Sequence, residues 1–170
     1  MRNFFVFESF RSFFERRREE RDLKRLLYDY SLKPRYYEDY SILSYFLGYP
    51  FFMPGEDLAR MAERMKSLRG QALRVIVLNT RGLHFVFSRN GEPEAVLREL
   101  KSAPMRLECN PLDGAFGDGA LSVVAKAHPA YGFLHLSWDG VARAVSDGYI
   151  IAGVFANGRC LKVALRSAHA

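Results

Sequence analysis

Between residues 133 and 166 the chain alternates short apolar runs with pairs of turn-forming residues. The runs are FLHLSW, VARAVS, YIIAGVFA and RCLKVAL, and the pairs between them are Asp139-Gly140, Asp147-Gly148 and Asn157-Gly158. Two-residue type I′ hairpins require such pairs, because both of their central positions need positive φ. The pattern therefore predicts a four-stranded antiparallel β-hairpin meander within residues 120–166.

Two amphipathic helices are predicted upstream of the meander. The helix at 56–69 has one apolar face, made of Leu58, Met61, Ala62, Met65 and Leu68. A shorter helix at 92–102 has Pro93 in its first turn. Strand-like runs lie at 73–78 and 83–88, and with PFFM at 50–53 as a first strand, residues 49–110 follow the β-α-β-β-α-β order of ferredoxin-like domains. A loop at 50–53 is the alternative, because a proline precedes the phenylalanines.

The N-terminal part of the chain has a different composition. Phe, Tyr, Arg and Glu recur there at helical spacing, which predicts a helical segment at 1–48 and an α+β domain at 49–170, joined as one integrated unit. The predicted fold class is α+β: the helical segment precedes a mainly antiparallel sheet with two covering helices and the C-terminal meander. The aromatic residues of 37–52 are expected to join the two parts, with an exposed docking patch as the alternative.

Basic side chains are concentrated at the N-terminus. The chain has 25 Lys and Arg against 19 Asp and Glu, and residues 1–35 hold ten basic and six acidic side chains. On a straight helix, aromatic and basic residues from the stretch SFFERRREERDLKRLL and just before it share an arc of about 140°. They are Phe10, Phe13, Phe14, Arg17, Arg18, Arg21, Lys24 and Arg25. Because arginine contacts phosphate in bidentate fashion, the five cations are candidate nucleic-acid contacts and the three phenylalanines a candidate docking site for a partner.

The same stretch has two other interpretations. Arg16 with Glu20, Arg18 with Asp22 and Glu20 with Lys24 are opposite charges at i,i+4, which is typical of a solvated helix that supports itself. An anionic membrane surface could also hold the stripe. Leu23, Leu26 and Leu27 fall on a different face from the phenylalanines, so a bend near residue 20 would let both halves pack on the protein.

The segment RGLHFVFS at 81–88 partly matches the RNP1 pattern of RNA-recognition motifs. Arg81, Gly82, Phe85 and Val86 fit, but Leu83 and Ser88 replace two of the three ring positions. We therefore predict a structural hairpin here, and keep Arg81 and Phe85 as candidate nucleic-acid contacts.

No motif indicates catalysis or metal binding. The glycine-rich stretch at 113–119 precedes a strand-like run, whereas a phosphate-binding loop opens a helix. His84, His128, His135 and Cys109 lack the spacing of metal ligands or of a Cys-His pair. We predict a protein that is not an enzyme and uses no cofactor and no metal. The enzyme alternative is a pocket near 113–119 with His84 and His135.

The two cysteines, Cys109 and Cys160, do not form a disulfide framework, which favours a reducing compartment. Strand alternation places Cys160 on the solvent side of the last strand. The longest apolar run, ILSYFLGYPFFM, has about half the length of a membrane-spanning helix. These features predict a soluble, cytoplasmic protein.

The predicted function is non-enzymatic binding, in which the basic, aromatic N-terminal helix contacts nucleic acid or a nucleoprotein complex. The alternative is an accessory subunit that docks on a protein assembly through its aromatic N-terminal half. The assembly could lie at a membrane surface.

Overall fold

The computed structural model describes residues 2–48, 50–102 and 121–168, with side chains from residue 10 onward. Its elements in chain order are α1 (Arg2–Asp29), β1 (Lys33–Tyr36), β2 (Tyr40–Tyr45), β3 (Phe51–Pro54), α2 (Gly55–Arg69), β4 (Ala72–Asn79), β5 (Gly82–Ser88), α3 (Glu94–Glu99), β6 (Leu121–Val124), β7 (Lys126–His128), β8 (Phe133–Ser137), α4 (Trp138–Ser146), β9 (Tyr149–Ala156) and β10 (Leu161–Ser167). This is the predicted α+β class.

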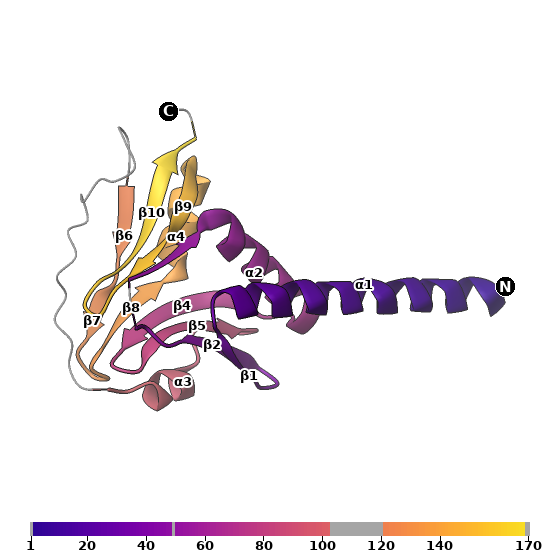
Figure 1. Ribbon diagram of the computed structural model, residues 1–170, viewed down its shortest axis with the longest axis horizontal. Coiled ribbons are helices and arrows are strands. Elements are labelled where there is room, and N and C mark those ends of the chain that lie inside the picture. Colours follow the sequence, from indigo (N-terminus) through magenta and orange to yellow (C-terminus); the bar gives the residue numbers. More distant parts are fainter. Residues whose placement is uncertain (1, 49, 103–120, 169–170) are drawn as a thin grey trace.

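The strands form two sheets with antiparallel pairing throughout. One sheet has six strands in the order β1-β2-β5-β4-β8-β7, and the other has four in the order β3-β9-β10-β6. The segment from β6 to β7 passes from one sheet to the other at the buried Ala125. Figure 1 shows the four-stranded sheet above the six-stranded sheet, and α1 extending sideways from both.

A single apolar cluster joins the two sheets. It contains inward-facing residues of both sheets together with Leu58, Met61 and Met65 of α2 and Val141 of α4. Both helices contact β4 of one sheet and β9 of the other. The opposite face of the six-stranded sheet carries a second cluster, which α3 covers with Val96 and Leu97. The six-stranded sheet is therefore buried on both faces, as the fully buried strand β5 illustrates.

The predicted helix at 56–69 is confirmed as α2. Glu56 and Asp57 lie in its first turn and Lys66 and Arg69 in its last. Each charge is opposite in sign to the nearby end of the helix dipole, which stabilises the helix. Gly70 ends the helix with φ of 65° and donates its N–H to the carbonyl of Lys66. The second predicted helix is shorter than expected, because α3 occupies only 94–99.

One run of the predicted C-terminal meander is wrong: VARAVS belongs to α4 and not to a strand. Val141 and Ala144 are buried at i,i+3, and Asp139 lies in the first turn, where a carboxylate favours helix formation. Asp139-Gly140 is therefore inside a helix, and Gly148, with φ of 95°, follows its end. As a result β8 pairs with β4 in the six-stranded sheet instead of with β9.

The hairpin between β9 and β10 is present, but its turn is not type I′. The connection runs from 157 to 160, and neither Asn157 nor Gly158 has positive φ. Instead the Asn157 side-chain oxygen accepts hydrogen bonds from the backbone N–H groups of Arg159 and Cys160 at 2.9 and 2.8 Å. This Asn side chain replaces the expected backbone turn.

Two predictions of chain organisation also differ from the structure. Residues 1–48 are helical only to Asp29, because β1 and β2 follow and join the six-stranded sheet. The ferredoxin-like order is not one sheet, since β3 pairs with β9 in the four-stranded sheet while β4 and β5 lie in the other. The strand expected near 106–109 lies outside the described residues.

Cys160 is not on a solvent-facing side, because only 8% of it is exposed, and it is disulfide-bonded. The sequence has one other cysteine, Cys109, which lies outside the described residues. A stable disulfide is uncommon in a reducing compartment, so this bond argues against the predicted cytoplasmic location.

Candidate binding surface on helix α1

Helix α1 is one continuous helix of 28 residues, without the bend considered near residue 20. Its C-terminal half lies against α2, and its N-terminal half extends beyond the rest of the molecule (Figure 1). Leu23, Leu26 and Leu27 are buried in the main apolar cluster. The leucine face thus attaches α1 to the body, and the opposite face is left to solvent.

Acidic side chains of α1 are used in the contact with α2. Glu19 accepts a hydrogen bond from the Ser67 hydroxyl at 2.7 Å and lies 3.7 Å from the Arg64 guanidinium. Asp22 lies 3.7 Å from a second nitrogen of Arg64. The Arg18–Asp22 pair expected for a self-supporting helix is absent from the described residues, because Asp22 points to α2 instead.

The predicted cations of α1 are exposed. Among residues 10–29, the one ion pair within α1 joins Arg11 and Glu15, at 3.3 Å. None of the five candidate phosphate contacts has an ion-pair partner among the described residues, and all five are exposed; they are Arg17, Arg18, Arg21, Lys24 and Arg25. Glu19 and Asp22 therefore face α2, whereas Glu20 lies among the exposed cations and Arg25 also lines a hollow beside α2.

The three candidate docking phenylalanines continue the basic face towards the N-terminus. Phe10, Phe13 and Phe14 are 58%, 50% and 65% exposed. The Phe13 and Phe14 rings meet edge to face with centroids 5.9 Å apart, and the Arg17 guanidinium lies 4.9 Å from the Phe13 centroid. A shallow hollow of about 490 Å³ lies along this face, lined by Phe14, Arg17, Glu20, Arg21 and Lys24.

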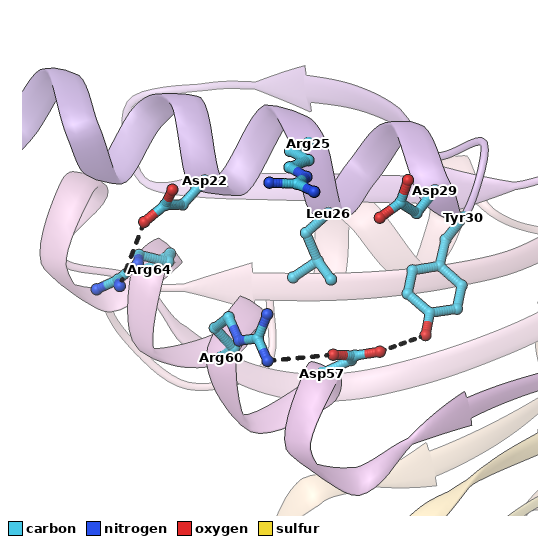
Figure 2. Close-up of a pocket in the computed structure, with 8 residues that line it drawn as sticks. All are labelled: Asp22, Arg25, Leu26, Asp29, Tyr30, Asp57, Arg60 and Arg64. Atoms are coloured by element: carbon cyan, nitrogen blue, oxygen red, sulfur yellow. Dashed lines mark hydrogen bonds and ion pairs between the residues drawn. The ribbon is translucent and has the colours of Figure 1, made fainter.

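A second hollow, of about 520 Å³, lies between α1 and α2 and is drawn in Figure 2. The Tyr30 hydroxyl donates to Asp57 at 2.5 Å, and Asp57 also lies 3.5 Å from Arg60. Burial, followed by the hydrogen bond to Asp57, raises the pKa of Tyr30, so its hydroxyl stays protonated. Figure 2 shows Arg25 extending from α1 into this hollow.

The charges that line the second hollow are balanced. Three arginines and three aspartates line the hollow; Arg64 pairs with Asp22 across the two helices, and Arg60 pairs with Asp57 within α2. This arrangement fastens α1 to α2 and gives no excess of one charge for an ionic ligand. The sequence shows part of this arrangement, because α2 carries a polar stripe beside its apolar one. The stripe consists of Asp57, Arg60, Arg64 and Ser67, but the spacing does not show which residues of α1 they contact.

The candidates from the RNP1-like segment are not joined to this surface. Phe85 is fully buried in the main apolar cluster, so its proposed role as a nucleic-acid contact is wrong for this structure. Arg81 is exposed in the turn between β4 and β5, on the body of the molecule. The segment is a structural hairpin, as predicted.

The enzyme alternative gains no support from the residues that are described. His84 and His135 lie in the same row of the six-stranded sheet, but Val77 of β4 separates them. Both ring nitrogens of His84 are engaged: Nδ1 lies 2.8 Å from the Ser44 hydroxyl and Nε2 lies 2.9 Å from the Asn79 side-chain oxygen. Residues 113–119 lie outside the described residues.

Comparison with protein-family models, curated proteins and solved structures produced no match to this chain. None of the helices in the described part of the chain combines the length and apolarity needed to cross a lipid bilayer. The surface on α1 must therefore be interpreted from its own chemistry.

Proposed function

We propose that this is a non-enzymatic binding protein that contacts nucleic acid through the exposed face of α1. The observation that supports the proposal most is the division of charge on that helix. Glu19 and Asp22 pair with Arg64 of α2 and not with the cations of α1. Five exposed cations of one helix, none of which has an ion-pair partner among the described residues, match the contacts that a phosphate backbone makes.

Single strands are the preferred form of nucleic acid in this proposal. The exposed rings of Phe10, Phe13 and Phe14 offer faces on which unpaired bases stack, at about 1–3 kcal/mol per base. A duplex offers no such bases without distortion. The guanidinium of Arg17 beside the Phe13 ring adds a cation next to a stacking position.

The test is fluorescence anisotropy with labelled single- and double-stranded RNA and DNA across a series of salt concentrations. The variant Arg17→Gln, Arg18→Gln, Arg21→Gln removes three cations from the face. If each contacts one phosphate of a single strand, the slope of log K against log salt decreases by about 2.

The matched control removes the same charge elsewhere. Arg98, Arg143 and Arg166 are exposed on α3, α4 and β10, away from α1, and changing all three to Gln should leave most of the slope intact. Equal loss of binding in the two triple variants would mean that net charge alone drives association. Wild-type protein that does not bind any of the four probes at low salt overturns the proposal.

A second candidate function is supported by the exposed phenylalanines. An accessory subunit could dock on an anionic membrane surface, with these rings in the headgroup boundary and the cations near the lipid phosphates. In co-sedimentation with vesicles, this candidate predicts binding to phosphatidylserine mixtures but not to pure phosphatidylcholine. Changing Phe10, Phe13 and Phe14 to Ser should abolish vesicle binding, and binding that survives this change contradicts the candidate.

A further inference from the structure

A third hollow, of about 250 Å³, lies where α1, β1 and the end of α2 meet. It is lined by Glu20, Leu23, Lys24, Tyr36, Leu68 and Arg69. Glu20 and Lys24 also line the shallow hollow that begins at Phe14, so the two hollows form one continuous groove from Phe14 to Arg69. Figure 1 shows β1 and α2 beside the C-terminal half of α1, where this groove ends.

An aromatic ring and a guanidinium form the far end of the groove. The Arg69 guanidinium lies 4.6 Å from the centroid of the Tyr36 ring. Tyr36 is still 42% exposed, so part of its ring remains open to a ligand. The near end of the groove has the same combination, in which Arg17 lies over Phe13. A base can stack on such a ring while the guanidinium meets the adjoining phosphate.

Arg69 is held in place without being neutralised. Its guanidinium donates a hydrogen bond to the carbonyl of Tyr37 at 3.3 Å, which fixes it beside Tyr36. No carboxylate among the described residues forms an ion pair with Arg69. Its positive charge is therefore left for an anion that comes from outside the chain.

The charges that line the groove are predominantly positive. Its cations are Arg17, Arg21, Lys24 and Arg69, whereas Glu20 is the one carboxylate among the lining residues. The hollow of Figure 2 differs, because its arginines and aspartates are equal in number. An elongated groove with this excess of cations is complementary to a chain of phosphates.

Two more arginines extend the positive charge beyond the groove. Arg89 donates from Nε to the Arg69 carbonyl at 3.3 Å, and Arg74 donates to the Arg89 carbonyl at 3.0 Å. Neither has an ion-pair partner among the described residues. The neighbouring β1–β2 turn holds Glu38 and Asp39, which are exposed and form no ion pair with these arginines. Cations thus continue where the groove ends.

We propose that a single-stranded nucleic acid bound on α1 continues along this groove, with a base against Tyr36 and a phosphate at Arg69. The proposal rests on the function proposed for α1 and adds a second binding point on β1 and α2. A single strand can follow the groove because it bends freely and each of its bases has a face that can stack. No sequence pattern joins Tyr36 and Arg69, which meet only in the tertiary structure.

Fluorescence anisotropy with a labelled single strand of about 16 nucleotides, made of uridine or of thymidine, tests the groove. Tyr36→Ala should weaken binding by between about fivefold and about 100-fold, the effect of losing one stacked base. Tyr36→Phe keeps the ring and should bind as tightly as the wild type. Arg69→Gln should lower the slope of log K against log salt by about 0.7, which corresponds to one phosphate contact.

The matched control is Phe46→Ala, which also removes an exposed ring with a cation over it. Phe46 is 53% exposed, and the Lys33 ammonium lies 4.5 Å from the centroid of its ring. Phe46 follows the end of β2 that lies away from Tyr36, and it lines neither hollow of the groove. Its removal should leave the affinity unchanged. Equal losses in Tyr36→Ala and Phe46→Ala overturn the proposal.

Photochemical crosslinking of the wild type covers the case in which a variant misfolds. A strand that contains iodouridine, which links to a stacked ring on irradiation, should link to Tyr36 as well as to the phenylalanines of α1. Crosslinks confined to α1 overturn the groove and leave the function proposed for α1 standing. A Tyr36→Ala variant that is folded by circular dichroism and binds like the wild type has the same meaning. Wild-type protein that binds no single strand overturns both proposals.

Discussion

At the scale of single residues, the hydrogen-bonded chain Ser44–His84–Asn79 has the clearest chemistry. The Asn79 oxygen already accepts the backbone N–H groups of Arg81 and Gly82, and its amide nitrogen donates to the carbonyl of Leu100 at 2.9 Å. The ring of His84 must therefore donate through Nε2, and its Nδ1 accepts the Ser44 hydroxyl. Every polar atom of this buried network is satisfied, which favours a structural role over catalysis.

The buried ring of His84 predicts acid sensitivity. Burial, and then the nearby Arg35 and Arg81, lower its pKa to about 4 from 6.5. As the pH falls below 6.5, His84 becomes protonated in the unfolded chain but stays neutral in the folded chain. The contribution of His84 to the free energy of unfolding is therefore fully present above pH 6.5 and is lost towards pH 4, by up to about 3 kcal/mol. Urea unfolding of wild type and His84→Gln at several pH values measures this, and parallel stability curves for the two proteins would refute the assignment.

Gly82 allows a second prediction at this scale. Its φ is 141°, and a Cβ atom there would lie 2.1 Å from the carbonyl oxygen of Tyr45. Gly82→Ala should therefore destabilise the protein by more than about 2 kcal/mol. The matched control is Gly158→Ala, because a Cβ at Gly158 meets no atom within 4 Å and its φ is not positive. Similar unfolding midpoints for the two variants would contradict the close approach of β2 to Gly82.

At the scale of elements, α1 consists of a packed half and an exposed half. Leu26 belongs to the main cluster, whereas Phe10 is more than half exposed. Leu26→Ala should cost about 2–5 kcal/mol through loss of buried contacts. Phe10→Ala should change stability by no more than about 0.5 kcal/mol. Chemical denaturation compares the two, and a large cost at Phe10 would show that the N-terminal half packs on the molecule.

The elements also show where sequence patterns are reliable. Helix α2 was predictable because its apolar spacing, terminal charges and stop signal at Gly70 agree. The run VARAVS was misassigned because Asp-Gly pairs end helices as readily as they join strands, and six residues are too few for periodicity to decide. The cationic face of α1 was predicted residue by residue, but its freedom from ion pairs depended on Arg64 of a different helix.

At the scale of the whole molecule, the disulfide at Cys160 bears on where the protein works. The cytoplasmic location stays a prediction, and a disulfide-bonded Cys160 argues against it. We expect no reactive thiol after denaturation without reductant, and we expect Cys160→Ser to lower stability by about 2–4 kcal/mol. Thiol titration with and without reductant measures the first quantity. Two free thiols per chain in protein purified without reductant would restore the cytoplasmic prediction.

The sequence alone determined the features that depend on the periodicity of neighbouring residues. These are the α+β class, the 56–69 helix, the strands at 73–78 and 83–88, and the basic, aromatic face of the N-terminal helix. Only the tertiary structure decided three other features. They are the division of strands between two sheets, the pairing of Arg64 with acids of α1 and the contact between His128 and His135. Such contacts join residues through strand order, register and helix packing, and no local pattern encodes these.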